Sequence, residues 1–543
     1  MSQTRRPIAP PQAPNRPAAP VGRPNALDRT TVLPWDETVR PRPRGAGRPT
    51  RRRLWVRRGL VAAAILVAVA VLAAAGTYAY VDYRYGQIAK IKVPGLSHEG
   101  GSADKPMTIL LVGNNTRTGL SPSEIPQFGS PDEVAGARSD VTMLLRLDPK
   151  RGASILSIPR DLFVPLPPHS VAGSVGKIDG ALNDGPEHLV EAITGDLGIP
   201  IDHYVSINFD GFQQVVSALG GIDMSFPTPV RDSFSGLHIT TTGCQHLGGF
   251  QALAVVRARH LQYLDSRGRW VDDPESDLSR IRRDHAFLST LAKTTKDKGL
   301  TNPLRANAVL GNLVHQVTVD SGMSVGTMLG LIRRYHGLNP DAAPQLTLPV
   351  TLVPQPTYHF GGGSYGSVVF PSQPADAQVI ASFLGAPLAQ HPPGSVDVVD
   401  RSGRGSGQKV ADGLSGAGFT VGSVTREPVQ ASPSETVVRY HPGEAASATA
   451  VLSSLAGAAL VHDDAQVPAG TVEVDVGSVV KVVPAASASP SPTTPSGASS
   501  GASASAGATT AASPTTTASV PTPGGQPVTP SVTPLQPFDP RSC

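Results

Sequence analysis

The sequence predicts a mixed α/β protein whose main part is a three-layer α/β/α domain, and three features of the chain lead to this prediction. From about Met107 onward, short apolar runs alternate with helical patterns, which is typical of domains whose helices cover both faces of a sheet. A long uncharged segment precedes this region and predicts one transmembrane helix. A smaller strand, helix, strand region and a tail rich in Ser, Thr, Pro and Ala follow it, which predicts a small α/β domain and a disordered end.

The first segment, residues 1–58, is rich in Pro, Arg and Ala and has no apolar periodicity. Such a segment buries too little apolar surface to offset the entropy of ordering. We therefore interpret it as a disordered, basic cytoplasmic tail. Membrane topology alone explains its excess of arginine, and binding to anionic lipid or to a cytoplasmic partner is the alternative.

The second segment, residues 59–81, contains no charged side chain. At 1.5 Å per residue, such a helix spans ~33 Å, which is enough to cross a bilayer core. The arginines before it, and Tyr78 and Tyr80 near its end, predict a single-pass protein of the cell membrane, with a cytoplasmic N-terminus and an extracellular remainder. The small residues 73–76 leave a cleaved signal peptide as the alternative. Residues 82–106 are then a short linker.

The main domain is predicted over residues 107–385. The runs MTILLVG, VTMLLRLD, ASILSIP and HYVSINF predict strands. In PEHLVEAITGDLG, apolar residues at four-residue spacing follow Pro186, and FDGFQQVVSALGG ends in two glycines, so both segments predict helices. This alternation predicts the layered arrangement of helices and sheet.

A second domain is predicted over residues 394–483, where SVDVVDRSG, KVADGLSGAGF and GTVEVDVGSVVKVV follow one another as strand, helix and strand. Residues 484–543 are predicted to be a disordered tail because of their composition. Cys244 and Cys543 are the two cysteines of the chain. This number excludes a disulfide framework and a cysteine metal site, and it leaves open whether the two cysteines pair.

Charged residues abut the predicted strands and turns of the main domain. They fall into three clusters, which contain Asp140; Arg160 and Asp161; and Arg257, Arg259, Asp277, Arg280 and Arg283. Strand exits in α/β domains commonly line a ligand crevice, and arginine offers phosphate a planar fork of donors. A carboxylate such as Asp140 can hold a divalent cation or accept a proton from an attacking hydroxyl. The alternative is surface ion pairs, each worth under about 1 kcal/mol.

Local geometry constrains which of these side chains share a face. On a helix whose N-cap is Asp277, Arg280 and Arg283 lie on one face, whereas Arg282 points away. Arg257 and Arg259 are two residues apart, so they share a side if the chain there is extended. We therefore expect the arginines to converge on one anionic ligand.

The order and wording of several motifs add a family resemblance. The segments ILLVGNNTR, ARSDVTMLLRLD, SIPRDLFV, GKIDGALNDG, INFDGFQQVVSALGGID, LGGFQALAVVRARH and DLSRIRRD resemble the catalytic domains of the LytR-CpsA-Psr family over residues 107–300. The resemblance implies an α/β/α fold, binding of a polyprenyl-pyrophosphate-linked glycopolymer, and transfer of the phosphorylated glycan to a peptidoglycan hydroxyl with Mg²⁺ (or Mn²⁺). It also implies a possible pyrophosphatase side reaction. Residues 394–483 resemble the C-terminal domain often appended in actinobacterial members.

Site residues follow from the resemblance position by position. It implies that the pyrophosphate-binding and metal-site residues are Arg138, Asp140, Arg160, Arg257, Arg259 and Arg280, and Arg283 is added from the helix pattern. Asp161 matches the acidic residue of a Pro-Arg-Asp motif, with a catalytic role or the role of orienting Arg160. Asn115 stands where an Asp is usual, and its amide oxygen can coordinate Mg²⁺ without bringing charge. Asp284 and His285 stand where Gln is common.

A second class of function remains as the alternative to a phosphotransferase of cell-wall assembly: a non-catalytic protein that binds polyprenyl pyrophosphate or the wall, or acts as a transcriptional attenuator. Asn115 favours the non-catalytic class, and the complete arginine set favours the phosphotransferase. No helix-turn-helix pattern supports nucleic acid as a partner. The sequence does not reveal whether the glycopolymer is a teichoic acid, a teichuronic acid, an arabinogalactan or a capsule.

Overall fold

The computed structural model describes most of the two predicted domains. The described residues are 67, 68, 71, 76, 78–80, 82–97, 104–117, 136–166, 175–298, 316–335, 337–339, 342–352, 356–360, 363–385, 392–427, 435–478, 480–482 and 535–543. The predicted cytoplasmic tail, most of the predicted membrane helix and residues 484–534 of the predicted tail lie outside them. Residues 67, 68 and 71, in the first of two compact units, are helical. Within the described ranges, no helix combines the length and the apolar character needed to span a bilayer.

The centre of the second unit is a mixed seven-stranded sheet, in the order β1-β14-β7-β2-β3-β4-β15. Its strands are β1 (Ala89–Ile91), β2 (Met107–Asn114), β3 (Ser139–Asp148), β4 (Gly152–Ile158), β7 (His203–Ile207), β14 (Val317–Asp320) and β15 (Gln345–Thr347). β3 runs antiparallel to both β2 and β4, and β2 runs parallel to β7. The strands predicted from apolar runs are confirmed, as is the mixed α/β class. β1 lies in the predicted linker, so the domain begins earlier than residue 107.

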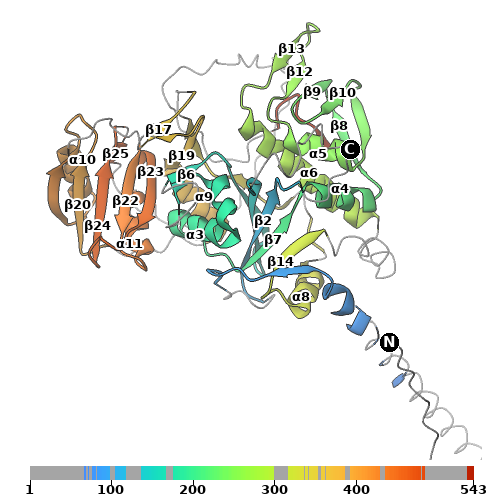
Figure 1. Cartoon of the computed structure of the whole chain (residues 1–543), viewed down its shortest axis with the longest axis horizontal. Coiled ribbons are helices and arrows are strands. Elements are labelled where there is room, and N and C mark those ends of the chain that lie inside the picture. The colour runs from blue at the N-terminus through green and yellow to red at the C-terminus, as the bar shows by residue number, and fades with distance from the viewer. Residues whose placement is uncertain are drawn as a thin grey trace, which may run out of the picture. The chain divides into compact units, whose positions relative to one another are not determined.

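Helices pack on both faces of this sheet (Figure 1). They are α3 (Pro186–Leu197), α4 (Phe209–Ala218), α5 (Gly249–Arg257), α6 (Asp277–Asp297), α8 (Val325–Tyr335), α9 (Ala375–Leu384) and the 3-10 helix η1 (Ile178–Asp184). Successive side chains of a strand point to opposite faces. Leu110 of β2 therefore joins a core with Leu189 of α3, whereas its neighbour Ile109 joins a core that includes Met328 of α8. A third core joins α4, α5 and α6.

Short strands also lie outside the two large sheets. They are β5 (Phe163–Pro165), β6 (Val175–Lys177), β8 (Ile222–Phe226), β9 (Val230–Asp232), β10 (Leu237–Ile239), β11 (Gly243–Leu247), β12 (Gln262–Leu264), β13 (Trp270–Asp272), β17 (His359–Phe360) and β18 (Gly363–Ser364). β8 pairs with β11, and β9 pairs with β10 and β12. Strands β8 to β13 lie in the connections between α4, α5 and α6, whereas β5 pairs with β6 and β17 with β18 outside those connections.

The second predicted domain shares a sheet with the first. The sheet contains β16 (Val350–Leu352), β19 (Val369–Gln373), β20 (Ser395–Asp400), β21 (Val421–Arg426), β22 (Thr436–Tyr440), β23 (Leu455–Asp463), β24 (Thr471–Val476) and β25 (Val480–Val482), and it carries α10 (Gly407–Gly416) and α11 (Ala445–Leu452). β19 belongs to the first predicted domain, yet its Ser372 pairs with Ala458 of β23. The sheet therefore crosses the predicted boundary between residues 385 and 394, because backbone groups at the edge of β19 remain free to pair.

The last nine described residues return to the main domain, and we call residues 535–543 the C-terminal strap. β26 (Arg541–Ser542) pairs antiparallel with β8, and Cys543 forms a disulfide with Cys244. The ring of Phe538 stacks on that of Tyr263, with centroids 4.1 Å apart. This part of the predicted disordered tail is ordered, because an aromatic ring, a paired backbone and a covalent bond offset its ordering entropy.

Candidate active site

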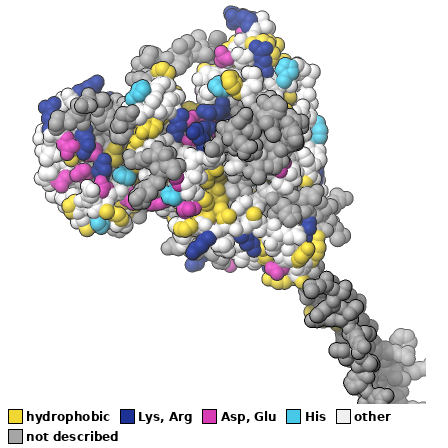
Figure 2. All heavy atoms as spheres, viewed as in Figure 1, with side chains coloured by type: hydrophobic (Ala, Val, Ile, Leu, Met, Phe, Trp, Pro, Cys, Tyr) yellow, Lys and Arg dark blue, Asp and Glu magenta, His cyan; other side chains and the backbone are white. Residues whose placement is uncertain are grey.

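A polar pocket of about 240 Å³ opens where β2 and β4 end and β3 begins. It is lined by Asn115, Arg117, Asp140, Arg160, Phe234, Arg257, Arg259, His260 and Arg280. Six of these residues were predicted from the sequence, and the structure brings all six together. Figure 2 shows basic side chains gathered near the middle of the visible face, next to acidic ones. Carboxylates near the guanidinium groups limit their mutual repulsion and fix their directions.

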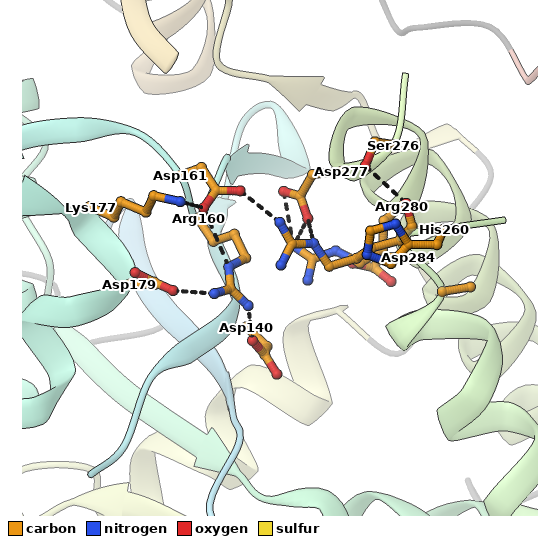
Figure 3. Close-up of polar contacts among 12 residues, drawn as sticks. Asp140, Arg160, Asp161, Lys177, Asp179, His260, Ser276, Asp277, Arg280 and Asp284 are labelled. Carbon is orange, nitrogen blue, oxygen red and sulfur yellow. Dashed lines mark hydrogen bonds and ion pairs between the residues drawn. The ribbon is translucent and has the colours of Figure 1, made fainter. Parts of the chain in front are cut away.

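Arg160, which follows β4, is fixed from several sides (Figure 3). It forms a close ion pair with Asp140, and its Nη2 lies 2.6 Å from Oδ2 of Asp179. Its Nε lies 3.9 Å from Oδ1 of Asp161. Burial alone would lower the pKa of Arg160, but the charges of these carboxylates outweigh burial and raise it. Arg160 is therefore a permanently charged group with a fixed position.

Asp161 lies beside the pocket rather than in its lining. Its Oδ1 accepts a hydrogen bond from Lys177 Nζ at 2.7 Å, and its Oδ2 accepts one from Arg259 Nη2 at 2.8 Å. Burial acts to raise the pKa of Asp161, but Arg259 and Lys177 overcome that effect and lower it. The carboxylate stays ionised, so its geometry suits orienting Arg259 and Arg160 rather than accepting a proton.

Arg257 and Arg259 reach the pocket from the end of α5. The helix ends at Arg257, and Ala258 is extended with ψ 108°, so the two side chains fall on one side as the sequence predicts for an extended chain. Arg257 lies over the ring of Phe209, 4.5 Å from its centroid, and burial lowers its pKa. Arg259 Nε lies 2.9 Å from Oδ1 of Asp277.

The first turn of α6 supplies Arg280. Its Nη2 lies 3.2 Å from Oδ1 of Asp277, and its side chain is only 3% exposed. Asp277 is the first helical residue, and the N-cap is Ser276, so the predicted cap is displaced by one residue. Ser276 has φ 47° and is the one non-glycine residue at positive φ in the described chain. Its hydroxyl donates to the carbonyl of Arg259 at 2.9 Å, which joins the helix start to the arginine pair.

Two predicted arginines lie elsewhere. Arg283 is fully buried, with Nη1 3.0 Å from Asp273 Oδ2 and 3.6 Å from Asp539 Oδ1, and it does not line the pocket. Its assignment as a pyrophosphate ligand is therefore corrected: although Arg283 shares a helix face with Arg280, its ion pairs with Asp273 and Asp539 hold the guanidinium in the core. Arg138 is exposed and also outside the lining. Its backbone N–H donates to Asn115 Oδ1 at 3.0 Å.

Sequence reasoning missed several residues of the site. Arg117, Phe234 and His260 belong to the lining, and Lys177 and Asp179 to the ion-pair network. Lys177 and Asp179 belong to the motif GKIDG. The two charged residues between glycines were the feature of the sequence that could have indicated a place in the site. Asp179 is 1% exposed, and burial raises its pKa. No group of three or more His, Cys, Asp or Glu residues suited to holding a metal is found in the described ranges.

An apolar cavity of about 300 Å³ adjoins the polar pocket. Its walls come from the sheet, α4, α5 and α6, and they include Leu111, Val205, Phe212, Val215, Leu253 and Phe287. Asp140 and Arg257 line both the cavity and the polar pocket. The two spaces therefore meet at these residues, and together they fit a molecule with an anionic group joined to a hydrocarbon chain.

Comparisons with known proteins agree on one family. The model of the LytR-cpsA-psr family matches residues 71–373, and a model described as LytR cell envelope-related transcriptional attenuator matches residues 394–479. The probable cell wall biosynthesis protein LcpB of Corynebacterium glutamicum is 32% identical over 230 residues, which cover 42% of this chain and 51% of that protein. The cell wall biosynthesis protein LcpA of the same organism is 27% identical, over 56% of this chain and 59% of that protein. The chain thus spans about half the length of these curated relatives.

Other similar proteins come from further organisms. The polyisoprenyl-teichoic acid–peptidoglycan teichoic acid transferase TagV of Bacillus subtilis is 28% identical over 54% of this chain and 73% of that protein. Among solved structures, a LytR-Csp2A-Psr enzyme from Actinomyces oris matches with TM-score 0.42 and 24% identity, over 55% of this chain and 96% of the other. The structure of TagV matches with TM-score 0.39 and 26% identity, over 52% and 98%.

Proposed function

Because the chain belongs to the LytR-CpsA-Psr family, whose model matches residues 71–373, we propose that it transfers a phosphorylated glycopolymer from a polyprenyl-pyrophosphate carrier to a hydroxyl of peptidoglycan. The product is a phosphodiester, formed during cell-wall assembly. The transferase name of the similar TagV protein supports this class of reaction. The proposal makes the chain an enzyme, a phosphotransferase.

One observation carries the proposal: a pocket with five arginines adjoins an apolar cavity, and Asp140 and Arg257 line both. A diphosphate is a compact dianionic group, and arginine is the side chain best suited to bind it in two-point contacts. A polyprenyl chain requires a hydrocarbon environment beside that group. A soluble nucleotide would leave the cavity empty, and a plain lipid would leave the arginines without an anion.

The donor is bound with its diphosphate among the arginines. Arg160, Arg259 and Arg280 are already held in place by carboxylates, so little reorganisation is needed when charge develops on the phosphate oxygens. The acceptor oxygen bonds to the glycan-side phosphorus, and the bond from that phosphorus to the bridging oxygen breaks. Polyprenyl phosphate leaves with that oxygen. The proton of the acceptor hydroxyl is released through a pocket carboxylate, for which Asp140 is the candidate.

The proposal includes a divalent cation in this pocket. Asp140 offers a carboxylate to both spaces, and Asn115 contributes an amide oxygen on the same lining. When bound, Mg²⁺ or Mn²⁺ would offset negative charge on the diphosphate oxygens. Asp140 and Asn115 are thus the metal residues of the proposal, and Asp140 and Arg160 are its central catalytic pair.

The proposal places the chain in the cell membrane with a single pass, its N-terminus in the cytoplasm and its catalytic domain outside. The uncharged segment 59–81 and the preceding arginines support this topology. The folded domain begins only a few residues after that segment. β1 pairs with β14, and the hydroxyl of Tyr85 donates to the carbonyl of Met323. The site then stays near the lipid donor and reaches peptidoglycan as its acceptor.

The test uses the full chain in detergent and measures polyprenyl phosphate released from a synthetic polyprenyl-diphosphate glycan, with Mg²⁺ or with EDTA. Arg160→Ala is expected to lower kcat about 100-fold or more, since a fixed charge next to the reacting phosphate is lost. Arg267→Ala, at an exposed position in the β12–β13 hairpin, is the matched control and should retain wild-type release. Wild-type protein that binds the lipid but never releases product, even with a peptidoglycan acceptor, would refute the enzyme and support a lipid-binding regulatory role.

A further inference from the structure

Asp284 is a buried carboxylate that the proposed reaction does not yet use. It lies one turn after Arg280 on α6, and its side chain is 4% exposed. Both carboxylate oxygens are buried and have no hydrogen-bond partner among the described residues. Its ion pair with Arg280 is long, at 3.9 Å from Nε to Oδ2. Burying a carboxylate without hydrogen bonds is costly, so this site calls for a further partner.

The position of Asp284 points to where that partner would lie. Asp284 lines the apolar cavity together with Asp140 and Arg257, the two residues that also line the arginine pocket. Figure 3 shows Asp284 next to Arg280, on the α6 side of the cluster that contains Asp140. The two carboxylates therefore face one space, at the point where a bound diphosphate would meet its hydrocarbon chain.

Electrostatics agrees with this geometry. Burial is the main cause that raises the pKa of Asp284 to about 7. The charges of Arg280 and Arg283 oppose this shift, and those of Asp277 and Asp140 add to it. Arg283 is engaged with Asp273 and Asp539. The nearby arginines thus leave the ionised form of Asp284 incompletely stabilised, and a divalent cation between Asp140 and Asp284 would supply the missing charge.

Asn115 is poorly suited to the same task. Its Oδ1 accepts the backbone N–H of Arg138 at 3.0 Å, and its own N–H donates to the carbonyl of Arg138 at 3.1 Å. These two hydrogen bonds join the residue after the end of β2 to the residue before the start of β3. Its amide oxygen is neutral and already accepts one bond, whereas the oxygens of Asp284 accept none in the described chain.

We propose that Asp284 and Asp140 are the two protein carboxylates that hold a divalent cation at the junction of the arginine pocket and the apolar cavity. This inference rests on the proposed function and deepens it. Mg²⁺ and Mn²⁺ are commonly held by one or two carboxylates, with the remaining positions filled by substrate phosphates and water. Two carboxylates are therefore sufficient. In this inference Asp284 takes the place that the proposed function gives to Asn115 as the second metal residue, and Asn115 keeps a structural role.

The experiment measures Mn²⁺ binding to the full chain by electron paramagnetic resonance, in the presence of inorganic pyrophosphate and without lipid. Asp284→Asn keeps the shape of the side chain and is expected to weaken Mn²⁺ binding at least tenfold. Asp376→Asn is the matched control, because Asp376 on α9 is also buried with a pKa raised to about 7 but lines neither space. Asp284→Ser is the second variant and is expected to show the same loss, so the test survives if one variant does not fold.

The outcomes separate this inference from the proposed function. Wild-type Mn²⁺ affinity in folded Asp284→Asn, with affinity lost in Asp140→Asn, would overturn the role of Asp284 and leave the transferase intact. Absence of Mn²⁺ binding in the wild type would also overturn it. Loss of Mn²⁺ binding in Asp284→Asn, together with absence of lipid turnover in the wild type, would uphold the cation site and refute the transferase.

Discussion

Asp161 and Arg160 are neighbours in sequence, yet they have different roles in the structure. Arg160 lines the pocket, whereas Asp161 is turned aside toward Lys177 and Arg259. The sequence predicts both residues at a strand exit but does not predict which of them faces the ligand. That choice depends on Lys177 and Asp179, which come from a separate part of the chain and contact this pair only after folding.

Arg283 is a second case in which the sequence predicts the position of a residue on an element but not the direction of its side chain. Helical periodicity correctly places Arg280 at the site, and it groups Arg283 with it. The structure buries Arg283 against Asp273 and Asp539. Asp539 lies in the strap, far away in sequence, so a prediction from the helix alone has no means of finding the partner that takes Arg283 away from the pocket.

Asp376 allows a prediction about pH at the residue scale. Burial raises its pKa to about 7, well above the value of about 4 in an unfolded chain. The folded state therefore holds the proton more tightly, and the stability this adds is full below about pH 4 and is lost as pH rises through about 7. Between pH 4 and 8 the free energy of unfolding should therefore fall by about 2–4 kcal/mol because of this group. Asp376→Asn should remove this fall, as measured by chemical unfolding over that pH range. The exposed Asp412→Asn should leave the pH dependence unchanged, and an equal pH dependence in Asp376→Asn would contradict the assignment.

At the scale of elements, the strands were the most predictable part. β2, β3 and β4 are near-continuous apolar runs because both faces of the sheet are covered, and such runs are visible in a sequence. β1 and β26 have three and two residues and no such signal. Their places are set by neighbours, since β1 pairs with β14 and β26 with β8.

The apolar cavity formed by the sheet, α4 and α5 gives a prediction about the lipid. Val215 of α4 lines this cavity and is absent from the lining of the arginine pocket. Val215→Phe fills part of the cavity, so binding of a polyprenyl diphosphate should weaken about tenfold, in line with the 1–3 kcal/mol that overpacking costs. Binding of inorganic pyrophosphate, measured by calorimetry on the same variant, should not change. Equal weakening for both ligands would mean that the cavity does not hold the lipid.

The contact between α6 and the strap gives a prediction about stability. Asp539 is fully buried, and its Oδ2 accepts a hydrogen bond from Arg282 Nε at 2.7 Å. Asp539→Ala leaves Arg282 and Arg283 with fewer partners in the core. The free energy of unfolding should fall by about 3–5 kcal/mol, as for other broken buried ion pairs. The exposed neighbour Arg541→Ala is the control in the same denaturation series, and a loss as large in that variant would argue against the buried pair as the cause.

At the scale of the whole molecule, the composition of residues 484–543 concealed the strap. Ser, Thr, Pro and Ala dominate this region. The residues that anchor the strap are Phe538, Asp539 and Cys543. Each does so through a contact with a residue far away in sequence, namely Tyr263, Arg282 and Cys244 in that order. The shared sheet was missed for a similar reason. β19 and β23 are separated by a predicted linker, and pairing between distant strands has no local signature.

The strap also predicts how truncated chains behave. A chain that ends at residue 483 loses Asp539, β26 and the disulfide together. Its melting temperature should lie below that of a Cys244→Ser, Cys543→Ser double variant, which keeps the strap and loses about 2–4 kcal/mol of stability. Scanning calorimetry of the three chains tests this order. A truncated chain as stable as the double variant would show that the strap contributes only through its covalent bond.

The bond between Cys244 and Cys543 also changes the connectivity of the molecule. The polypeptide between these residues is a closed covalent ring, and the domain matched at residues 394–479 is an insertion within that ring rather than an appendage at its end. A protease that cuts once between residues 484 and 534 therefore releases no fragment. The cut chain migrates as one band on a non-reducing gel and as two after reduction, and the smaller piece that reduction frees carries the strap. Release of the domain at residues 394–479 requires a second cut on its N-terminal side.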